Sequence, residues 1–169
     1  MTIQRLDECT APFIILKAQT TDDVQWLPEI LYKVDGKHLV ARRLRGSKMR
    51  TKQALMDEMA AALQFFEGFG ENWHAVKDCL ISLREWMPAD IYVIIISGAE
   101  DLLIEDEVAL HWLLVTLHEV GEFWAVSIED NDIFNRPAVP FRVVLQVSDD
   151  GKLREFQDRL GEDAALVEI

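Results

Sequence analysis

Residues 68–80, GFGENWHAVKDCL, hold the densest group of reactive side-chain types in the sequence: a histidine, a lysine, an amide, two acids and one of the two cysteines. A cysteine nucleophile needs a base within hydrogen-bond reach. On a helix, His74 and Cys79 are five residues apart and point to different faces. Free cysteine is also among the residue types most often buried. The stretch therefore predicts a core cysteine in place of a catalytic thiol.

Three further patterns fall short of a complete site. HEVGE (118–122) has the first half of a helical zinc-protease motif but lacks the second histidine. His111 and His118 are two turns apart, and no third ligand is evident beside them. No Lys-Ser or Lys-Thr pair follows Gly68 and Gly70, as a phosphate-binding loop requires. We predict no metal site, no cofactor and no enzymatic activity.

The polar residues of the same segment form one stripe on a helix. His74, Asp78, Ile81 and Glu85 fall at i, i+4, i+7 and i+11, and Lys77 lies on the flank. An ordinary solvated face has the same spacing, and it would hold a His74–Asp78 pair worth about 0.2–0.5 kcal/mol. Spacing alone favours the solvated face over a binding site.

The segments around this stripe are predicted helices. Apolar residues at helical spacing predict a helix over 51–66, which Gly68 and Gly70 end. Asn72 is a good N-cap for a second helix that runs to about Trp86. The stripe would thus lie on the second of two consecutive helices.

The next elements are a strand and a third helix. IYVIII (91–96) is apolar at every position, which is typical of a central strand in a parallel sheet. A helix over 105–119 opens on three acids and is expected to close at Gly121. Its expected apolar face consists of Val108, Trp112, Val115 and Leu117.

The two ends of the chain add further elements. PFIILKA (12–18) is a short apolar run, and residues 30–44 predict a hairpin with Asp35-Gly36 as its turn. FRVVLQV (141–147) predicts another strand, and residues 152–160 a short amphipathic helix after a turn at Asp150-Gly151. The alternation predicts an α/β fold with a mainly parallel sheet packed with helices, which the N-terminal hairpin would make mixed.

Length and composition favour one structural domain. With 169 residues and 50% apolar composition, the chain can bury one sizeable core. We expect an N-terminal extension (1–37), a main domain (38–148) and a C-terminal helical extension (149–169). The longest apolar run is too short to span a bilayer, and Cys9 and Cys79 fit no disulfide or zinc pattern. These features favour a cytoplasmic protein.

Net charge narrows the possible partners. The formal charge is −13, and residues 1–52 carry ten Lys or Arg and six acids, whereas residues 53–169 carry seven and 24. An acidic chain is repelled by nucleic acid and by anionic membranes, so we expect neither as a partner. The acidity suits either solubility or attraction of a basic protein.

FGENWHAVKDCL resembles the signature of the barstar family, the intracellular inhibitors of small secreted ribonucleases. The matching residues are Phe69, Gly70, Asn72, Ala75, Asp78, Cys79 and Leu80. The resemblance covers roughly residues 38–148 and implies a barstar-like fold. In the family, this loop and helix occlude the nuclease active site, and the aspartate mimics the substrate phosphate. By position, the resemblance gives that role to Asp78.

The chain departs from the family pattern beside this aspartate. His74 stands where the best-known member has a second aspartate, Lys77 where it has a tryptophan, and Gly68 where it has an aromatic residue. The acid Glu67 precedes the turn. These departures bear on which partner the chain binds.

The resemblance implies a non-catalytic inhibitor or immunity protein (antitoxin) that occludes the active site of a basic ribonuclease or nuclease toxin. The expected partner-binding residues are Phe69, Gly70, Glu71, Asn72, His74, Lys77, Asp78 and Ile81. The expected secondary acidic patch is Glu105, Asp106 and Glu107. The alternative is a barstar-fold regulatory or interaction module without nuclease inhibition, and a third interpretation is a small hydrolase or metal-dependent enzyme. The sequence leaves the oligomeric state open.

Overall fold

A five-stranded parallel sheet forms the centre of the molecule. The computed structural model describes residues 6–19, 36–129 and 135–169. The strands, in the order in which they lie side by side, are β2 (Leu39–Arg45), β3 (Ile91–Ser97), β4 (Phe141–Val147), β1 (Ile14–Ala18) and β5 (Val167–Glu168). All four neighbouring pairs are parallel. The α/β fold with a mainly parallel sheet is thus confirmed.

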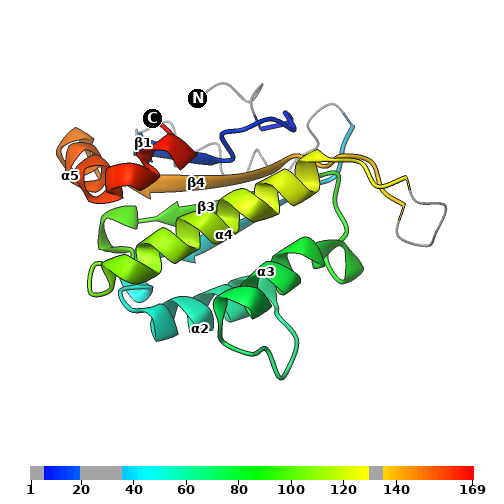
Figure 1. Cartoon of the computed structure of the whole chain (residues 1–169), viewed down its shortest axis with the longest axis horizontal. Coiled ribbons are helices and arrows are strands. Elements are labelled where there is room, and N and C mark those ends of the chain that lie inside the picture. The colour runs from blue at the N-terminus through cyan, green and yellow to red at the C-terminus, as the bar shows by residue number, and fades with distance from the viewer. Residues whose placement is uncertain (1–5, 20–35, 130–134) are drawn as a thin grey trace.

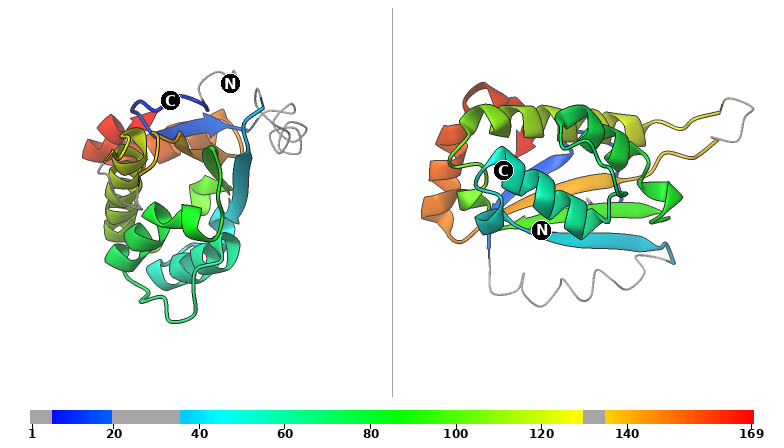
Figure 2. Two further views of the ribbon diagram at one scale, coloured as in Figure 1. Left: turned by 90° about the vertical axis from the view of Figure 1, so that its right-hand side faces the viewer. Right: turned by 90° about the horizontal axis from the view of Figure 1, so that it is seen from below.

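Helices cover one face of this sheet (Figures 1 and 2). They are α2 (Lys52–Leu63), α3 (Trp73–Ile81) and α4 (Glu107–Ala125), and α5 (Asp150–Leu160) closes the end near β1 and β4. α2 contacts β2, whereas α4 contacts β4, β1 and α3. None of the described helices combines the length and apolarity needed to cross a membrane.

The central position of β3 follows from its composition. Ile94 and Ile96 pack into the core beneath the helices, whereas Ile91, Val93 and Ile95 belong to a smaller buried cluster on the other face. In a half-exposed strand every second residue is polar. Both faces of β3 are covered, so its residues are apolar without that alternation. The prediction of a central strand for 91–96 is confirmed.

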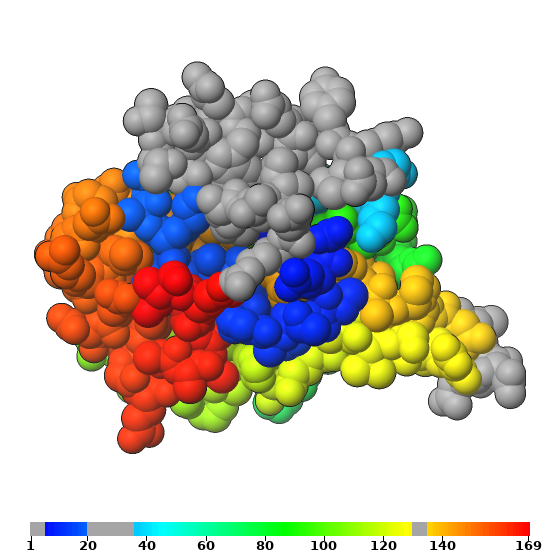
Figure 3. Space-filling view, turned by 90° about the horizontal axis from the view of Figure 1, so that it is seen from above, coloured from blue at the N-terminus to red at the C-terminus, as the bar shows by residue number. Residues whose placement is uncertain are grey.

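The N-terminal strand joins the sheet between β4 and β5. Ile14 lies opposite Val143 on one side and Val167 on the other, so both ends of the chain meet here (Figure 3). The first strand of the predicted hairpin and Asp35 lie outside the described residues. Among the described strands no antiparallel ladder occurs, and the only antiparallel contact between described residues is the isolated Ile128–Arg136 bridge.

Helix α4 differs from the sequence prediction at its end. It runs through Gly121 to Ala125, so the prediction that Gly121 ends it was wrong. Gly121 is buried, and a Cβ at this position would lie 2.2 Å from Cγ of Phe13. The glycine lets the N-terminal segment pack against α4.

The predicted apolar face of α4 was also wrong in two positions. Val108 is 70% exposed and Trp112 is 48% exposed. Apolar residues occur around the whole helix, so periodicity could not distinguish the face that packs on the sheet. The side chains that the fold buries are Ala109, Leu110, Leu113, Leu114, Thr116, Leu117, Val120 and Trp124.

Two further boundaries predicted from the sequence differ from those in the structure. α2 ends at Leu63, where Gln64 adopts a left-handed conformation, and Phe66 is 62% exposed beyond the helix. Asp150 and Gly151 do not form a separate turn, because they are the first residues of α5. The Asp149 carboxylate caps α5 by accepting a hydrogen bond from the Lys152 backbone N–H at 2.9 Å.

Candidate functional site

Asn72 fixes the start of α3 and the loop before it. Its side-chain Oδ1 accepts a hydrogen bond from the Ala75 backbone N–H at 3.0 Å, which is the expected N-cap contact. Its Nδ2 donates to the Gly70 carbonyl oxygen at 2.8 Å. One amide therefore ties the turn to the helix, and the loop projects from the helical layer at the bottom of Figure 1.

The same loop is held from two other sides. Glu71 adopts φ 47° and accepts a hydrogen bond from Nε2 of Gln53, on α2, at 2.8 Å. Phe69 is half-buried and lies against Phe65, with ring centroids 5.0 Å apart. A Cβ on Gly70 would lie 3.0 Å from Asn72 Nδ2, so a larger residue would press on the capping amide.

The inner side of α3 is anchored in the core. Cys79 is 2% exposed and Leu80 is fully buried. The indole Nε1 of Trp124, on α4, donates to the Leu80 carbonyl oxygen at 3.1 Å. Burial raises the pKa of the Cys79 thiol, and the charge of the adjacent Asp78 raises it further. A thiol with a raised pKa is poorly suited to nucleophilic attack, in agreement with the core role predicted from sequence.

The outer side of α3 carries Asp78 and His74, and both are exposed. Neither side chain forms an ion pair or hydrogen bond within the part of the chain that the structure describes. Ile81, one turn further on, is half-buried. The predicted stripe is therefore present from His74 to Ile81, with a carboxylate near its centre that pairs with no described residue. The prediction that this helix runs to about Trp86 was wrong, because α3 ends at Ile81 and Glu85 lies in a separate 3-10 turn, Leu83–Glu85.

Lys77 turns away from this stripe. Its Nζ donates to Oε2 of Glu119, on α4, at 2.8 Å. The ammonium charge next to Asp78 is thus balanced by an acid from another helix. The sequence alone does not reveal Glu119 as the partner of Lys77, because 42 positions separate the two residues and only the packing of α3 on α4 brings them together.

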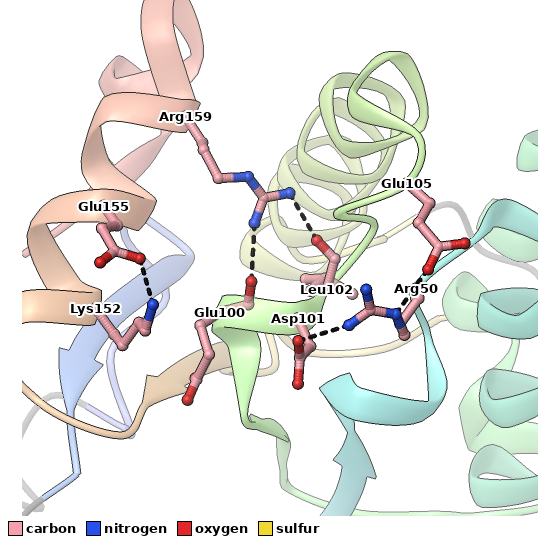
Figure 4. A network of polar contacts seen from close by, with 8 residues as sticks. All are labelled: Arg50, Glu100, Asp101, Leu102, Glu105, Lys152, Glu155 and Arg159. Carbon is pink, nitrogen blue, oxygen red and sulfur yellow. Dashed lines mark hydrogen bonds and ion pairs between the residues drawn. The ribbon is translucent and has the colours of Figure 1, made fainter.

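The predicted secondary acidic patch lies at the other end of α4. Arg50 donates to Glu105 and to Asp101 at 2.8 Å each, as Figure 4 shows. Asp106 is the N-cap of α4 and accepts from the Ala109 backbone N–H at 3.1 Å. Glu107, the first residue of α4, is exposed.

This patch is far from the Lys77–Glu119 pair along the helix. From Glu107 to Glu119 the helix rises about 18 Å, because each of the twelve residues adds about 1.5 Å. The fold therefore places Glu119 beside α3, and Glu105 beside Arg50.

The two histidines of α4 do not converge. Nδ1 of His111 lies 2.9 Å from Oδ1 of Asp163, whereas the His118 ring packs against Phe13 with centroids 5.6 Å apart. No group of three His, Cys, Asp or Glu suited to a metal ion occurs in residues 6–19, 36–129 and 135–169.

Comparison with known proteins identifies one family. The family model described as Barstar (barnase inhibitor) matches residues 39–146. The match begins with the first residue of β2 and ends within β4, so it contains α2, the Asn72 loop, α3, β3 and α4. β1, α5 and β5 lie outside it. No curated protein and no solved structure gave a significant match.

Proposed function

Because the chain belongs to the barstar family, we propose that it is a non-catalytic inhibitor that occludes the active site of a basic ribonuclease. The contact surface would consist of the loop before α3 and the outer side of α3. Its residues are Phe69, Gly70, Glu71, Asn72, His74, Lys77, Asp78 and Ile81.

The exposed carboxylate of Asp78, which pairs with none of the described residues, carries this proposal. The Asn72 cap holds one end of α3, and the hydrogen bond from Trp124 to Leu80 holds the other. A site that cleaves RNA gathers cationic side chains around the phosphate. A carboxylate on a rigid helix pairs with several of them, and little conformational entropy is lost on binding.

The contact between Lys77 and Glu119 supports the same function. A free ammonium group beside Asp78 would repel a basic active site. Glu119 neutralises that charge at 2.8 Å and adds an acid on the α4 side of the surface. We therefore propose Glu119 as the principal secondary acid of the contact surface. The patch predicted at Glu105, Asp106 and Glu107 should contribute little to affinity, because Glu105 pairs with Arg50 and Asp106 caps α4.

The charge distribution favours fast association with a basic protein. Residues 53–169, which include the whole contact surface, carry 24 acids and seven Lys or Arg. Complementary fields raise the rate of encounter between charged proteins. An inhibitor of this kind protects the cell that makes the nuclease, so we expect an immunity protein that acts in the cytoplasm.

Partner capture tests the proposal. Wild type and Asp78→Ala are immobilised side by side and exposed to extract and culture medium of the source cells. We expect a small basic nuclease to be retained by wild type and lost from Asp78→Ala, and the eluted nuclease to be inhibited by added wild-type chain in an RNA cleavage assay. A retained protein without nuclease activity, or equal retention by both chains, would contradict it.

A second candidate is an interaction module that does not inhibit a nuclease. The exposed Val108 and Trp112 on α4 favour it, because exposed large apolar side chains at helical spacing are typical of protein contacts. In that case Trp112→Glu should abolish retention of the partner, and Asp78→Ala should leave retention intact. The capture experiment thus distinguishes the two functions.

A further inference from the structure

A pocket of about 520 Å³ lies where the end of α3 meets the last turn of α4. Its apolar wall is formed by Ile81, Phe123, Trp124 and Ile128. Pockets that bind small molecules have volumes of about 300–1,000 Å³ and combine apolar walls with a few polar groups. Its polar lining residues are Ser82, Arg84, Glu85, Asn135 and Arg136, and the two arginines bring positive charge to the pocket.

Arg136 is held rigidly in the wall. It is 8% exposed, and its guanidinium lies over the rings of Phe123 and Trp124 at 4.3 and 4.6 Å from their centroids. Nη1 donates to the Val126 carbonyl oxygen at 2.8 Å and Nη2 to that of Phe123. The buried Nε of Arg136 has no hydrogen-bond partner among the residues that the structure describes. Carbonyl groups at the end of α4 orient this cation without neutralising it.

Arg84 places a second cation at the same pocket. Its side chain is exposed and makes no hydrogen bond or ion pair within the described residues. Burial lowers the pKa of Arg136, and the charge of Arg84 lowers it further, so the two guanidinium groups repel each other. Glu85 also lines the pocket, yet it pairs with neither arginine in the described part of the chain.

This arrangement is unusual for so acidic a protein. The chain has a formal charge of −13, and Arg45 and Arg50, two of its other arginines, contact carboxylates directly. Two adjacent arginines that pair with no carboxylate of the described residues leave a local positive charge over an aromatic floor. An anion would relieve the repulsion between them.

We propose that this pocket binds a small organic carboxylate with a flat apolar body. The carboxylate would pair with the exposed guanidinium of Arg84 next to the charge of Arg136, because the planar fork of arginine matches a carboxylate. The apolar body would lie against Ile81, Trp124 and Ile128. The proposal does not depend on nuclease inhibition. A bound molecule would, however, lie at the edge of the α3 surface, because Ile81 belongs both to the pocket wall and to the proposed contact surface.

Titration with 2-naphthoate tests the pocket, and 2-naphthamide serves as a neutral control of nearly the same shape. Binding is measured by calorimetry and by the NMR signal of the Trp124 indole N–H. We expect saturable binding of naphthoate and about tenfold weaker binding of naphthamide, because one charge-assisted hydrogen bond is lost. The Trp124 signal should shift with naphthoate.

Two matched variants test whether Arg84 is the residue that binds the carboxylate. Arg84→Gln removes a guanidinium that makes no described contact, so the fold should be preserved. Arg154→Gln removes an exposed arginine on α5, away from the pocket. We expect naphthoate affinity to fall about tenfold in Arg84→Gln and to stay unchanged in Arg154→Gln. Absence of saturable naphthoate binding, equal affinity for naphthamide, or an unchanged Arg84→Gln would overturn the proposal.

Discussion

The outer side of α3 and the start of α4 both carry carboxylates, but these carboxylates have different surroundings. Asp78 is exposed and pairs with no described residue. Glu105 and Asp101 both accept hydrogen bonds from Arg50, and Asp106 caps α4. The first acid is available to a partner, whereas the second group holds the local fold together. The number of acids in a segment therefore does not locate a binding surface, because each acid's own partner decides its role.

The largest predicted effect is a loss of partner affinity that distinguishes the two acidic regions directly. Asp78→Ala should weaken partner binding by about 100-fold, because about 3 kcal/mol is lost when buried cations are left unpaired. Glu105→Ala should leave affinity within about twofold. Titration calorimetry with the captured partner measures both.

Unfolding in urea is the control for this pair of variants. Asp78→Ala should retain the wild-type midpoint, since the side chain is exposed and forms no hydrogen bond or ion pair with the described residues. If Glu105→Ala weakened binding as much as Asp78→Ala, the distinction between the two acidic regions would fail.

A smaller effect is expected where α3 and α4 meet. Glu119→Gln should release Lys77 and lower affinity for a basic partner by about tenfold, since an unbalanced cation then stands beside Asp78. Adding Lys77→Met to this variant should restore most of the loss. A double-mutant cycle of binding constants measures the coupling, and additive effects would show that the pair has no role in the interface.

The third effect concerns the charge at position 74. His74→Lys places a fixed positive charge one turn from Asp78 and opposite a basic partner. We expect partner affinity to fall severalfold in His74→Lys and to change less in His74→Gln, as measured by titration calorimetry. Equal affinities for the two variants would place His74 outside the contact surface.

The smallest effect concerns stability and not binding. The hydrogen bond from Arg45 lowers the pKa of Glu58 below its ordinary value. Because the folded-state pKa is the lower one, the ionised pair stabilises the protein above the ordinary carboxyl range, and this contribution is lost as pH falls through the folded-state pKa.

Unfolding free energies measured in urea from pH 7 to pH 3 should therefore decline less steeply in Glu58→Gln than in wild type. A Glu58→Gln curve parallel to wild type would mean that the Arg45 pair does not stabilise the protein.

Much of α3 could be predicted because its determinants are local. Asn72 suits an N-cap, and helical spacing assigns Cys79 to the inner side and Asp78 to the outer side. The structure agrees with all three assignments. Each depends on residues within one or two turns, and the geometry of a helix fixes their relation.

Helix α4 could not be predicted as well. Its apolar residues surround the whole helix, so Val108 and Trp112 were assigned to the wrong face. The role of Gly121 was missed because a glycine that ends a helix and a glycine that admits Phe13 have the same sequence signal. In both cases the packing partner decides, and it comes from a distant part of the chain.

The sequence by itself determined the family, the parallel α/β fold and the outward position of Asp78, because these follow from motif order, periodicity and local capping. Only the tertiary structure decided which charges remain free. Lys77 meets Glu119 and Arg50 meets Glu105, whereas Arg84 lies near the cation Arg136 and pairs with no carboxylate of the described residues. The physical reason is that pairing depends on distances of a few ångströms between helices and loops, and chain packing alone sets those distances.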